Sequence, residues 1–239
     1  MTRTPTILAT SGGFSYDARG VLRPAGLAKL ALRLTGADRP KLCFVPTASG
    51  DSVSYVQLIY AAFAGWSVDV SHLSLFPMPN VDDLRKHVLA QDVLWVGGGS
   101  VAGLLAMWRL HGLDDVMREA WDAGVVLAGV SAGSICWHTG GPTDSFGPEL
   151  RAISNGLGLL PYGNGVHYDS EDQRRPLLHR MVADGTLPAS YATDDGAGLL
   201  YRGAEPPTVH AERDGAQGYL VEAAGGEAKE TVLDAEPAP

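Results

Sequence analysis

A serine flanked by two glycines stands at the end of an apolar run in this chain. The stretch VVLAGVSAGSICW, residues 125–137, holds the pattern G-x-S-x-G around Ser131. On a strand-to-helix turn this pattern forms a nucleophile elbow, in which the glycines let backbone segments approach closely and the serine hydroxyl is left exposed. The N–H group of Ala132 would then begin a helix, where it can donate to a developing oxyanion. The pattern predicts a nucleophilic serine, with a tight turn that does no chemistry as the alternative.

A second glycine turn, residues 97–99, follows the apolar stretch DVLWV. Glycines allow a backbone to approach a substrate closely, so we expect this turn to supply a second oxyanion donor. A phosphate-binding loop is the alternative. The chain has no G-x-x-x-x-G-K-[ST] pattern, and GGGSVAG matches the dinucleotide fingerprint poorly, which favours the oxyanion role.

A serine nucleophile needs a base, and the histidines are the first candidates. His167 ends the strand-like segment YGNGVH within a glycine-rich loop. His138 lies seven residues after Ser131 on the helix expected there and should point away from the site. We therefore expect His167 to be the base.

The acidic residue that orients this histidine is open between two aspartates. Asp144, in GGPTDSFGP, and Asp195, in ATDDGAG, both lie in loops beside apolar segments. Asp169 is close to His167 in sequence but should project the other way. A buried carboxylate would hold the imidazole tautomer and stabilise the imidazolium.

The elements that must position these residues alternate between strand-like and helix-like segments. Strands are expected within residues 6–13, 41–49, 67–76, 92–99 and 125–130. Continuous apolar strands separated by amphipathic helices predict a three-layer α/β fold, in which a mostly parallel sheet carries helices on both faces. Function in such sheets lies outside the carboxyl ends of the strands, so the serine and glycine turns should meet at one edge.

Composition limits the class of protein. The chain has 239 residues, of which 45% are apolar and 19% charged, enough for a sizeable core. We expect one α/β domain over residues 1–222 and a flexible tail over residues 223–239, where aromatic residues are scarce. The two cysteines, Cys43 and Cys136, are expected to be small core residues rather than a disulfide.

Charge and motifs exclude several functions. The net charge of −9 and the lack of any Lys/Arg run argue against nucleic acid as a partner. No stretch approaches the about 18 continuous apolar residues of a membrane span, and no signal peptide is evident, so a cytoplasmic protein without a membrane partner is expected. The chain has no H-E-x-x-H motif and no cysteine cluster, so we expect neither a metal nor another cofactor.

Five motifs in order carry a family resemblance: FVPTAS, LWVGGGSVAGLL, GVSAGSICW, TDSFGP and GVHYDSEDQRR. Together they resemble the dipeptidase E (α-aspartyl dipeptidase) family of serine peptidases, to which cyanophycinases are more distantly related. The resemblance covers roughly residues 5–222. It implies a fold similar to class I glutamine amidotransferase domains, whose elbow carries cysteine. Serine at this position favours peptide hydrolysis over glutamine-dependent amide transfer.

The resemblance also assigns roles to residues. The nucleophile, the base and the two oxyanion donors of the family fall on Ser131, His167 and the backbone N–H groups of Gly99 and Ala132. An acidic residue before a glycine matches Asp195, and an aspartate after the elbow helix matches Asp144; we rank Asp195 slightly higher and expect both near the site. The chain departs from the family in having aspartate where glutamate is usual and in its short segment between His167 and Asp195.

The substrate class follows from the resemblance. Dipeptidase E enzymes cleave after an N-terminal aspartate, whose carboxylate needs a cation. Arg174 and Arg175 are the expected substrate-binding residues, since a guanidinium pairs bidentately with a carboxylate; the alternative is that both are ordinary arginines of a helix's first turn.

We therefore expect a serine peptidase, most simply a dipeptidase, that cleaves a small peptide through an acyl-enzyme. A hydrolase of isopeptide or β-aspartyl bonds, an esterase, and a non-catalytic relative that binds a small molecule are the alternatives. The oligomeric state, a homodimer included, and the choice between a strict dipeptidase and a broader peptidase stay open.

Overall fold

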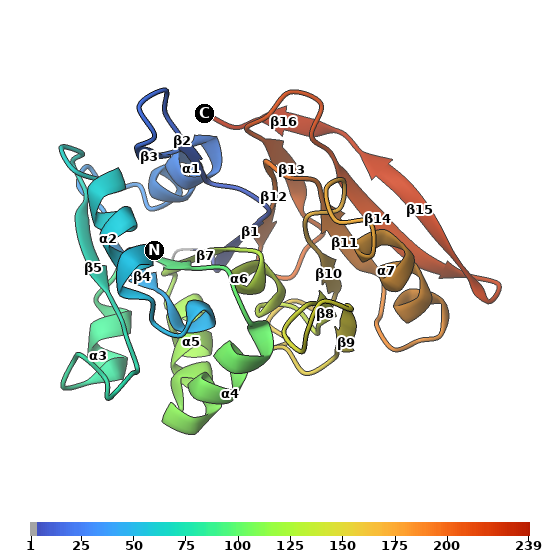
Figure 1. The fold of residues 1–239 in the computed structure, drawn as a ribbon, viewed down its shortest axis with the longest axis horizontal. Helices are drawn as coiled ribbons and strands as arrows, with labels where there is room; N and C mark the ends of the chain where they lie inside the picture. Colours follow the sequence, from blue (N-terminus) through green and yellow to red (C-terminus); the bar gives the residue numbers. More distant parts are fainter. Residues whose placement is uncertain (1–3) are drawn as a thin grey trace.

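A large mixed sheet forms the centre of the protein (Figure 1). The structure is a computed structural model that describes residues 4–239. Within them, the strands of this sheet are β1 (Thr6–Thr10), β4 (Lys41–Val45), β5 (Asp69–His72), β6 (Val93–Val96), β7 (Val126–Val130), β12 (Ala197–Arg202), β13 (Thr208–Ala211) and β16 (Ala235–Pro237). The spatial order is β16-β13-β12-β1-β7-β6-β4-β5. In this spatial order, the neighbouring strands β1, β7, β6, β4 and β5 are parallel to one another, whereas β12 is antiparallel to β1.

Helices cover both faces of this sheet because its strands are apolar on both sides. The helices are α1 (Gly26–Leu34), α2 (Val53–Ala62), α3 (Leu84–Leu89), α4 (Val101–His111) and α5 (Leu113–Asp122). Ile7 of β1 belongs to the core cluster under α4 and α5, and the next residue, Leu8, belongs to the cluster under α1 and α2. This alternation is what a pleated strand buried on two faces requires. The predicted three-layer α/β fold is confirmed.

A smaller sheet lies beside the central one. Its strands are β10 (Gly163–Gly165), β11 (Ser190–Thr193), β14 (Gly218–Ala224) and β15 (Glu227–Leu233), in that order. Helix α7 (Arg174–Ala183) packs on it through Leu178, Met181 and Val182 (Figure 1). The shorter elements are β2 (Phe14–Tyr16), β3 (Leu22–Pro24), the 3-10 turn η1 (Thr47–Ser49), α6 (Ala132–Ile135), β8 (Gly141–Thr143) and β9 (Arg151–Ile153).

Residues 223–239 are not the flexible tail that their composition predicts. Strand β15 pairs antiparallel with β14, from Gly218 opposite Leu233 to Ala224 opposite Glu227, and β16 pairs in parallel with β13. Gly225 and Gly226 have positive φ values and form the turn between β14 and β15. Backbone pairing needs no aromatic side chains, so a polar, aromatic-poor segment can still be ordered as an edge strand.

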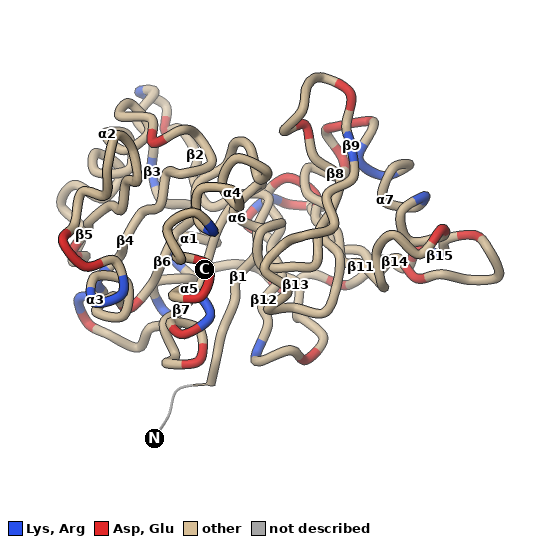
Figure 2. Tube along the Cα trace, turned by 90° about the horizontal axis from the view of Figure 1, so that it is seen from below, with Lys and Arg blue, Asp and Glu red and all other residues tan. Residues whose placement is uncertain are grey.

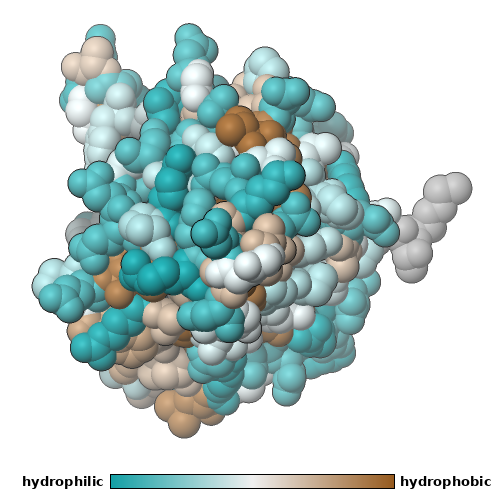
Figure 3. Space-filling view, turned by 90° about the vertical axis from the view of Figure 1, so that its right-hand side faces the viewer, coloured by the Kyte–Doolittle hydropathy of each residue, from teal (hydrophilic) through white to brown (hydrophobic). Residues whose placement is uncertain are grey.

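The surface is polar and its charges are dispersed. Figure 2 shows lysines and arginines distributed among acidic residues along the described chain, with no long basic run. The face that holds α7 and β15 is mostly hydrophilic, with small apolar patches (Figure 3). None of the helices in residues 4–239 is both long and apolar enough to cross a membrane. Cys43 and Cys136 are free and buried, as expected.

Candidate active site

Ser131 lies on the turn between β7 and α6, as the G-x-S-x-G pattern predicts. Its backbone has φ 58° and ψ −113°, a conformation that a residue with a side chain rarely adopts. The Ser131 N–H donates to the carbonyl of Thr10 at 3.1 Å, and the Ser131 carbonyl accepts from Ser134 and Ile135 at 2.9 and 3.0 Å. Such a backbone costs about 1–3 kcal/mol and persists only where the surrounding structure enforces it, which is typical of functional sites.

The two glycines of the pattern are required by the backbone around the serine. A Cβ at Gly129 would lie 2.3 Å from the carbonyl oxygen of Gly133. A Cβ at Gly133 would lie 2.3 Å from the carbonyl oxygen of Val96 on the neighbouring strand β6. Both positions therefore exclude any side chain, and the elbow is packed against β6 by backbone contact.

This close contact leads to a stability prediction. We expect Gly133→Ala to lower the free energy of unfolding by about 3 kcal/mol, the upper end of the usual cost of overpacking, because backbone atoms must move apart. Guanidinium denaturation measures this change. Gly103→Ala in α4 is the matched control: its Cβ would meet only the side chain of Ser100, and alanine is the better helix former. Equal stability of the two variants would contradict the packing argument.

The glycine turn after β6 lies against Ser131. A Cβ at Gly98 would be 3.3 Å from the Ser131 Cβ. Gly97 N–H donates to Val45, and Gly98 N–H donates to the Tyr55 hydroxyl. Gly99 has φ +134°, and its N–H, like that of Ala132, has no acceptor within residues 4–239. Two backbone donors beside the serine are thus available to an oxyanion.

His167 and Asp195 form a close pair. The Nδ1 atom of His167 lies 2.5 Å from Oδ1 of Asp195, on the turn between β11 and β12. Burial raises the pKa of Asp195, but hydrogen bonds from His167 and Ser170 and the charge of Arg213 outweigh it, so the pKa is lowered overall. Asp195 is then ionised at neutral pH and can only accept, which places the proton on Nδ1 and leaves Nε2 as the basic nitrogen of the neutral ring.

The histidine and the serine are both tied to the end of β1. Ser131 N–H donates to the carbonyl of Thr10, and His167 N–H donates to the hydroxyl of Ser11 at 3.1 Å. The Ser131 hydroxyl has no hydrogen-bond partner in the part of the chain that the structure describes. Catalytic hydrogen bonds of this kind often tighten only when substrate binds. Strands β1, β7 and β6 are neighbours in the central sheet, so the turns that follow them lie at the same edge of that sheet.

Asp144 does not partner the histidine. It is exposed in the loop between β8 and β9, where its carbonyl accepts from Gly147 N–H at 3.0 Å. Together with residues 171–173 it lines a pocket of about 380 Å³. Of the two aspartates left open by the sequence, the structure brings Asp195 to His167.

Arg174 is used inside the protein rather than exposed to a ligand. Its side chain is buried; Nε donates to Glu171 at 2.7 Å and Nη1 donates to the carbonyl of Pro142 at 2.6 Å. The expected substrate role is therefore corrected: Arg174 begins α7 and fastens it to β8.

Arg175 also has internal partners. Its guanidinium carbon lies 4.6 and 4.7 Å from the ring centroids of Tyr168 and Tyr219, and Nη1 is 3.2 Å from Oε1 of Glu230 on β15. The side chain joins α7 to the smaller sheet and is 43% exposed. Helix α7 packs against the smaller sheet and against β8, which gives both arginines partners inside the protein.

His138 is a structural residue, as its spacing from Ser131 indicated. Its Nδ1 lies 2.9 Å from the carbonyl oxygen of Ser134, and Nε2 lies 3.0 Å from the Tyr201 hydroxyl. Complete burial lowers the pKa of His138 to about 4, so the ring is neutral at physiological pH.

Two further residues bear on the site. Arg213, after β13, donates through Nε to the carbonyl of Asp195 at 2.8 Å and pairs through Nη2 with Asp169 at 2.5 Å. Asp169 in turn accepts from the Asp195 N–H at 2.8 Å. Asp169 was expected to project away from His167, and it faces the Asp195 backbone instead. Nothing in the sequence pattern pointed to Arg213, which approaches from another strand.

The chain is similar to known peptidases in sequence and in fold. The family model of peptidase family S51 matches residues 7–208. The chain is 42% identical over 210 residues to the uncharacterized peptidase YgaJ of Bacillus subtilis (strain 168), covering 88% of each protein. It is 29% identical over 175 residues to peptidase E of Shewanella denitrificans, covering 68% of this chain and 72% of that one. In fold it is similar to the crystal structure of a peptidase from an acI-B1 actinobacterium, with a TM-score of 0.68, 17% identity and coverage of 98% and 96%.

Proposed function

This chain belongs to peptidase family S51, and from that premise we propose that it is a dipeptidase that cleaves after an N-terminal aspartate through an acyl-enzyme. The observation that carries the serine mechanism is the pair of His167 and Asp195, 2.5 Å apart and tied to the same strand end as Ser131. A nucleophile, a base and an orienting carboxylate are the parts that acyl transfer requires.

The proposed reaction has two halves. His167 Nε2 takes the proton of the Ser131 hydroxyl as its oxygen attacks the peptide carbonyl carbon, and the oxyanion accepts from the N–H groups of Gly99 and Ala132. The protonated imidazole then gives its proton to the leaving amine as the C–N bond breaks. Water attacks the resulting ester, again with His167 as base, and releases the N-terminal amino acid. Asp195 stabilises the imidazolium in both halves.

The preference for aspartate is supported by the motif resemblance and by the peptidase E relative. Arg174 is buried and bound to groups of the protein, whereas Arg175 is 43% exposed and remains the proposed cation for the substrate carboxylate. The free, buried cysteines agree with a reducing compartment, and we propose the cytoplasm.

A substrate profile tests the proposal. We expect kcat/KM for Asp-Leu to exceed that for Asn-Leu and Ala-Leu by at least about tenfold, since a hydrogen bond to a charged group is worth about 1.5–3 kcal/mol. Release of leucine measures the rate. Faster cleavage of the β-aspartyl isomer or of a simple p-nitrophenyl ester would instead support one of the other hydrolase classes.

A further inference from the structure

We propose that Arg213 and Asp169 are positioning residues that hold the Asp195 carboxylate in register with His167. The proposal rests on the serine mechanism above and deepens it. Within residues 4–239, neither residue is hydrogen-bonded to Ser131 or to the His167 imidazole; both act through the backbone of Asp195, on either side of its side chain.

The hydrogen bonds form a closed ring around Asp195. Its N–H donates to Oδ1 of Asp169 at 2.8 Å, and its carbonyl accepts from Nε of Arg213 at 2.8 Å. The other Asp169 oxygen and Nη2 of Arg213 close the ring at 2.5 Å. Both peptide groups that flank the carboxylate are therefore fixed by one ion pair, which we call the Asp169–Arg213 clamp.

The turn that carries Asp195 does not by itself fix the position of the Asp195 carboxylate. The Asp195 side chain is 43% exposed, so water competes for its oxygens, and the turn itself ties down only the neighbours: Gly196 N–H donates to Ser11, and Asp194 N–H to Gln217. Within residues 4–239, the peptide N–H and carbonyl of Asp195 are bonded only to the clamp. A carboxylate on a short side chain follows its backbone, so fixing the peptide groups fixes the hydrogen bond to His167.

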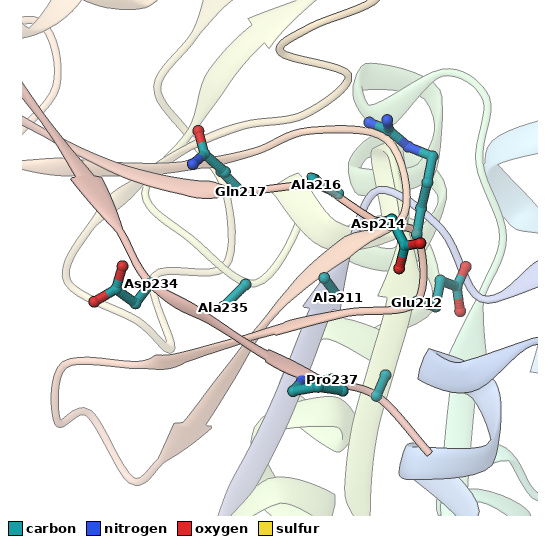
Figure 4. Close-up of a pocket in the computed structure, with 11 residues that line it drawn as sticks. Ala211, Glu212, Asp214, Ala216, Gln217, Asp234, Ala235 and Pro237 are labelled. Carbon is teal, nitrogen blue, oxygen red and sulfur yellow. The ribbon is translucent and has the colours of Figure 1, made fainter.

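The backbone at Arg213 is held in place because the preceding residue, Glu212, is hydrogen-bonded to two other segments. Glu212 Oε1 accepts from Gly13 N–H and Oε2 from Leu27 N–H, both at 2.7 Å, which ties the end of β13 to the turn after β1 and to the start of α1. Figure 4 shows Glu212 beside that N-terminal segment, at the rim of a pocket of about 390 Å³ lined by residues 211–217, 234, 235, 237 and 238. A Cβ at Gly196 would lie 2.8 Å from the Arg213 Cβ, so the segment packs closely on the Asp195 turn.

The charges around Asp195 suit orientation more than attraction. Asp169 pairs with Arg213 and offsets part of the charge that Arg213 places near the carboxylate. Asp194, the preceding residue, is held by Gln217 N–H and the Tyr219 hydroxyl. Loss of the clamp is therefore expected to act through the geometry of Asp195, and it should change turnover more than substrate binding.

The test compares Arg213→Ala, Arg213→Lys and Asp169→Asn with the wild type. We expect Arg213→Ala to lower kcat about 100-fold, the scale of a misplacement near 1 Å, with KM changed less than about threefold. Lysine keeps the positive charge but lacks the planar guanidinium group, and asparagine keeps a hydrogen-bond acceptor but not the ion pair. The kcat values of Arg213→Lys and Asp169→Asn should therefore lie between those of the wild type and Arg213→Ala.

Two controls make the effect specific. Added guanidinium ion should partly restore kcat in Arg213→Ala, since the Arg213 side chain is 49% exposed, and should leave the wild type unchanged. Arg85→Ala removes an arginine that pairs with Glu119 on the surface away from the site, and its kinetics should equal those of the wild type. Far-UV circular dichroism verifies that each variant is folded.

A spectroscopic readout separates this inference from the serine mechanism. We expect a downfield proton resonance for His167 Nδ1–H in the wild type, absent in His167→Gln and broadened or lost in Arg213→Ala. If the wild type is active and Arg213→Ala keeps its resonance and its kcat, the clamp is overturned while the proposed function stands. If the wild type hydrolyses no peptide and its serine is not labelled, the proposed function fails, and the resonance alone decides whether the clamp holds.

Discussion

Ser131→Ala should lower kcat by about 10⁵–10⁶-fold, leaving peptide hydrolysis barely above the uncatalysed rate. The hydroxyl is the group that forms the acyl-enzyme, and alanine cannot replace it. The fold should survive, because alanine at φ 58° is under the same backbone strain as serine and adds no atoms. Hydrolysis of Asp-Leu measures the loss, and thermal unfolding of the variant measures its stability.

Labelling gives the control for this prediction. A fluorophosphonate should attach to Ser131 in the wild type and to nothing in Ser131→Ala. Ser131→Cys should react with iodoacetamide when the wild type does not, because Cys43 and Cys136 are both buried, and burial raises the pKa of the Cys43 thiol to about 12. Substantial peptidase activity in Ser131→Ala would remove Ser131 as the nucleophile.

Asp195→Asn should lower kcat by about 10³–10⁴-fold, because an amide can present its N–H₂ group to His167 and favour the wrong imidazole tautomer. Asp144→Asn is the matched control, since it makes the same chemical change at the aspartate that the structure leaves exposed. We expect its kcat to stay within about threefold of the wild type. The reverse ranking would give the role to Asp144 and overturn the pair that the structure brings together.

The Asp195 carboxyl should also make the free energy of unfolding depend on pH. The pKa of Asp195 lies below its ordinary value of 3.8 in the folded state, so its contribution is present above that pH and is lost as pH falls through the folded value. Asp195→Asn should therefore reduce the free energy of unfolding at pH 7 and reduce it less at pH 3. Urea denaturation at the two pH values measures the difference.

The sequence predicted features that local chain geometry decides. The central strands are apolar on both faces, which distinguishes a covered parallel sheet from an exposed one, and G-x-S-x-G is a requirement of a single turn. His167 could be singled out because the glycine-rich loop around it offered no helical or strand role for its side chain. These inferences depend on few residues, close together in the chain.

Features that depend on contacts between distant segments were beyond the sequence. The choice between Asp144 and Asp195 is made by β11 pairing in parallel with β10, which brings the β11–β12 turn to His167. Arg174 looks like a substrate cation until α7 is placed against β8, where the Arg174 side chain is buried. The strands after residue 223 have backbone partners but few apolar side chains to reveal them.

The position of Arg213 has a consequence for the order in which the protein is made. A chain leaves the ribosome from its N-terminus, and folding can begin during synthesis. Strand β7 and Ser131 emerge from the ribosome before β13 and Arg213, which come later in the chain. We expect a nascent chain that already contains its serine turn to reach no more than about one hundredth of the full kcat until Arg213 has emerged and docked on the Asp195 turn. The late strands would then act as a delay between synthesis and peptidase activity.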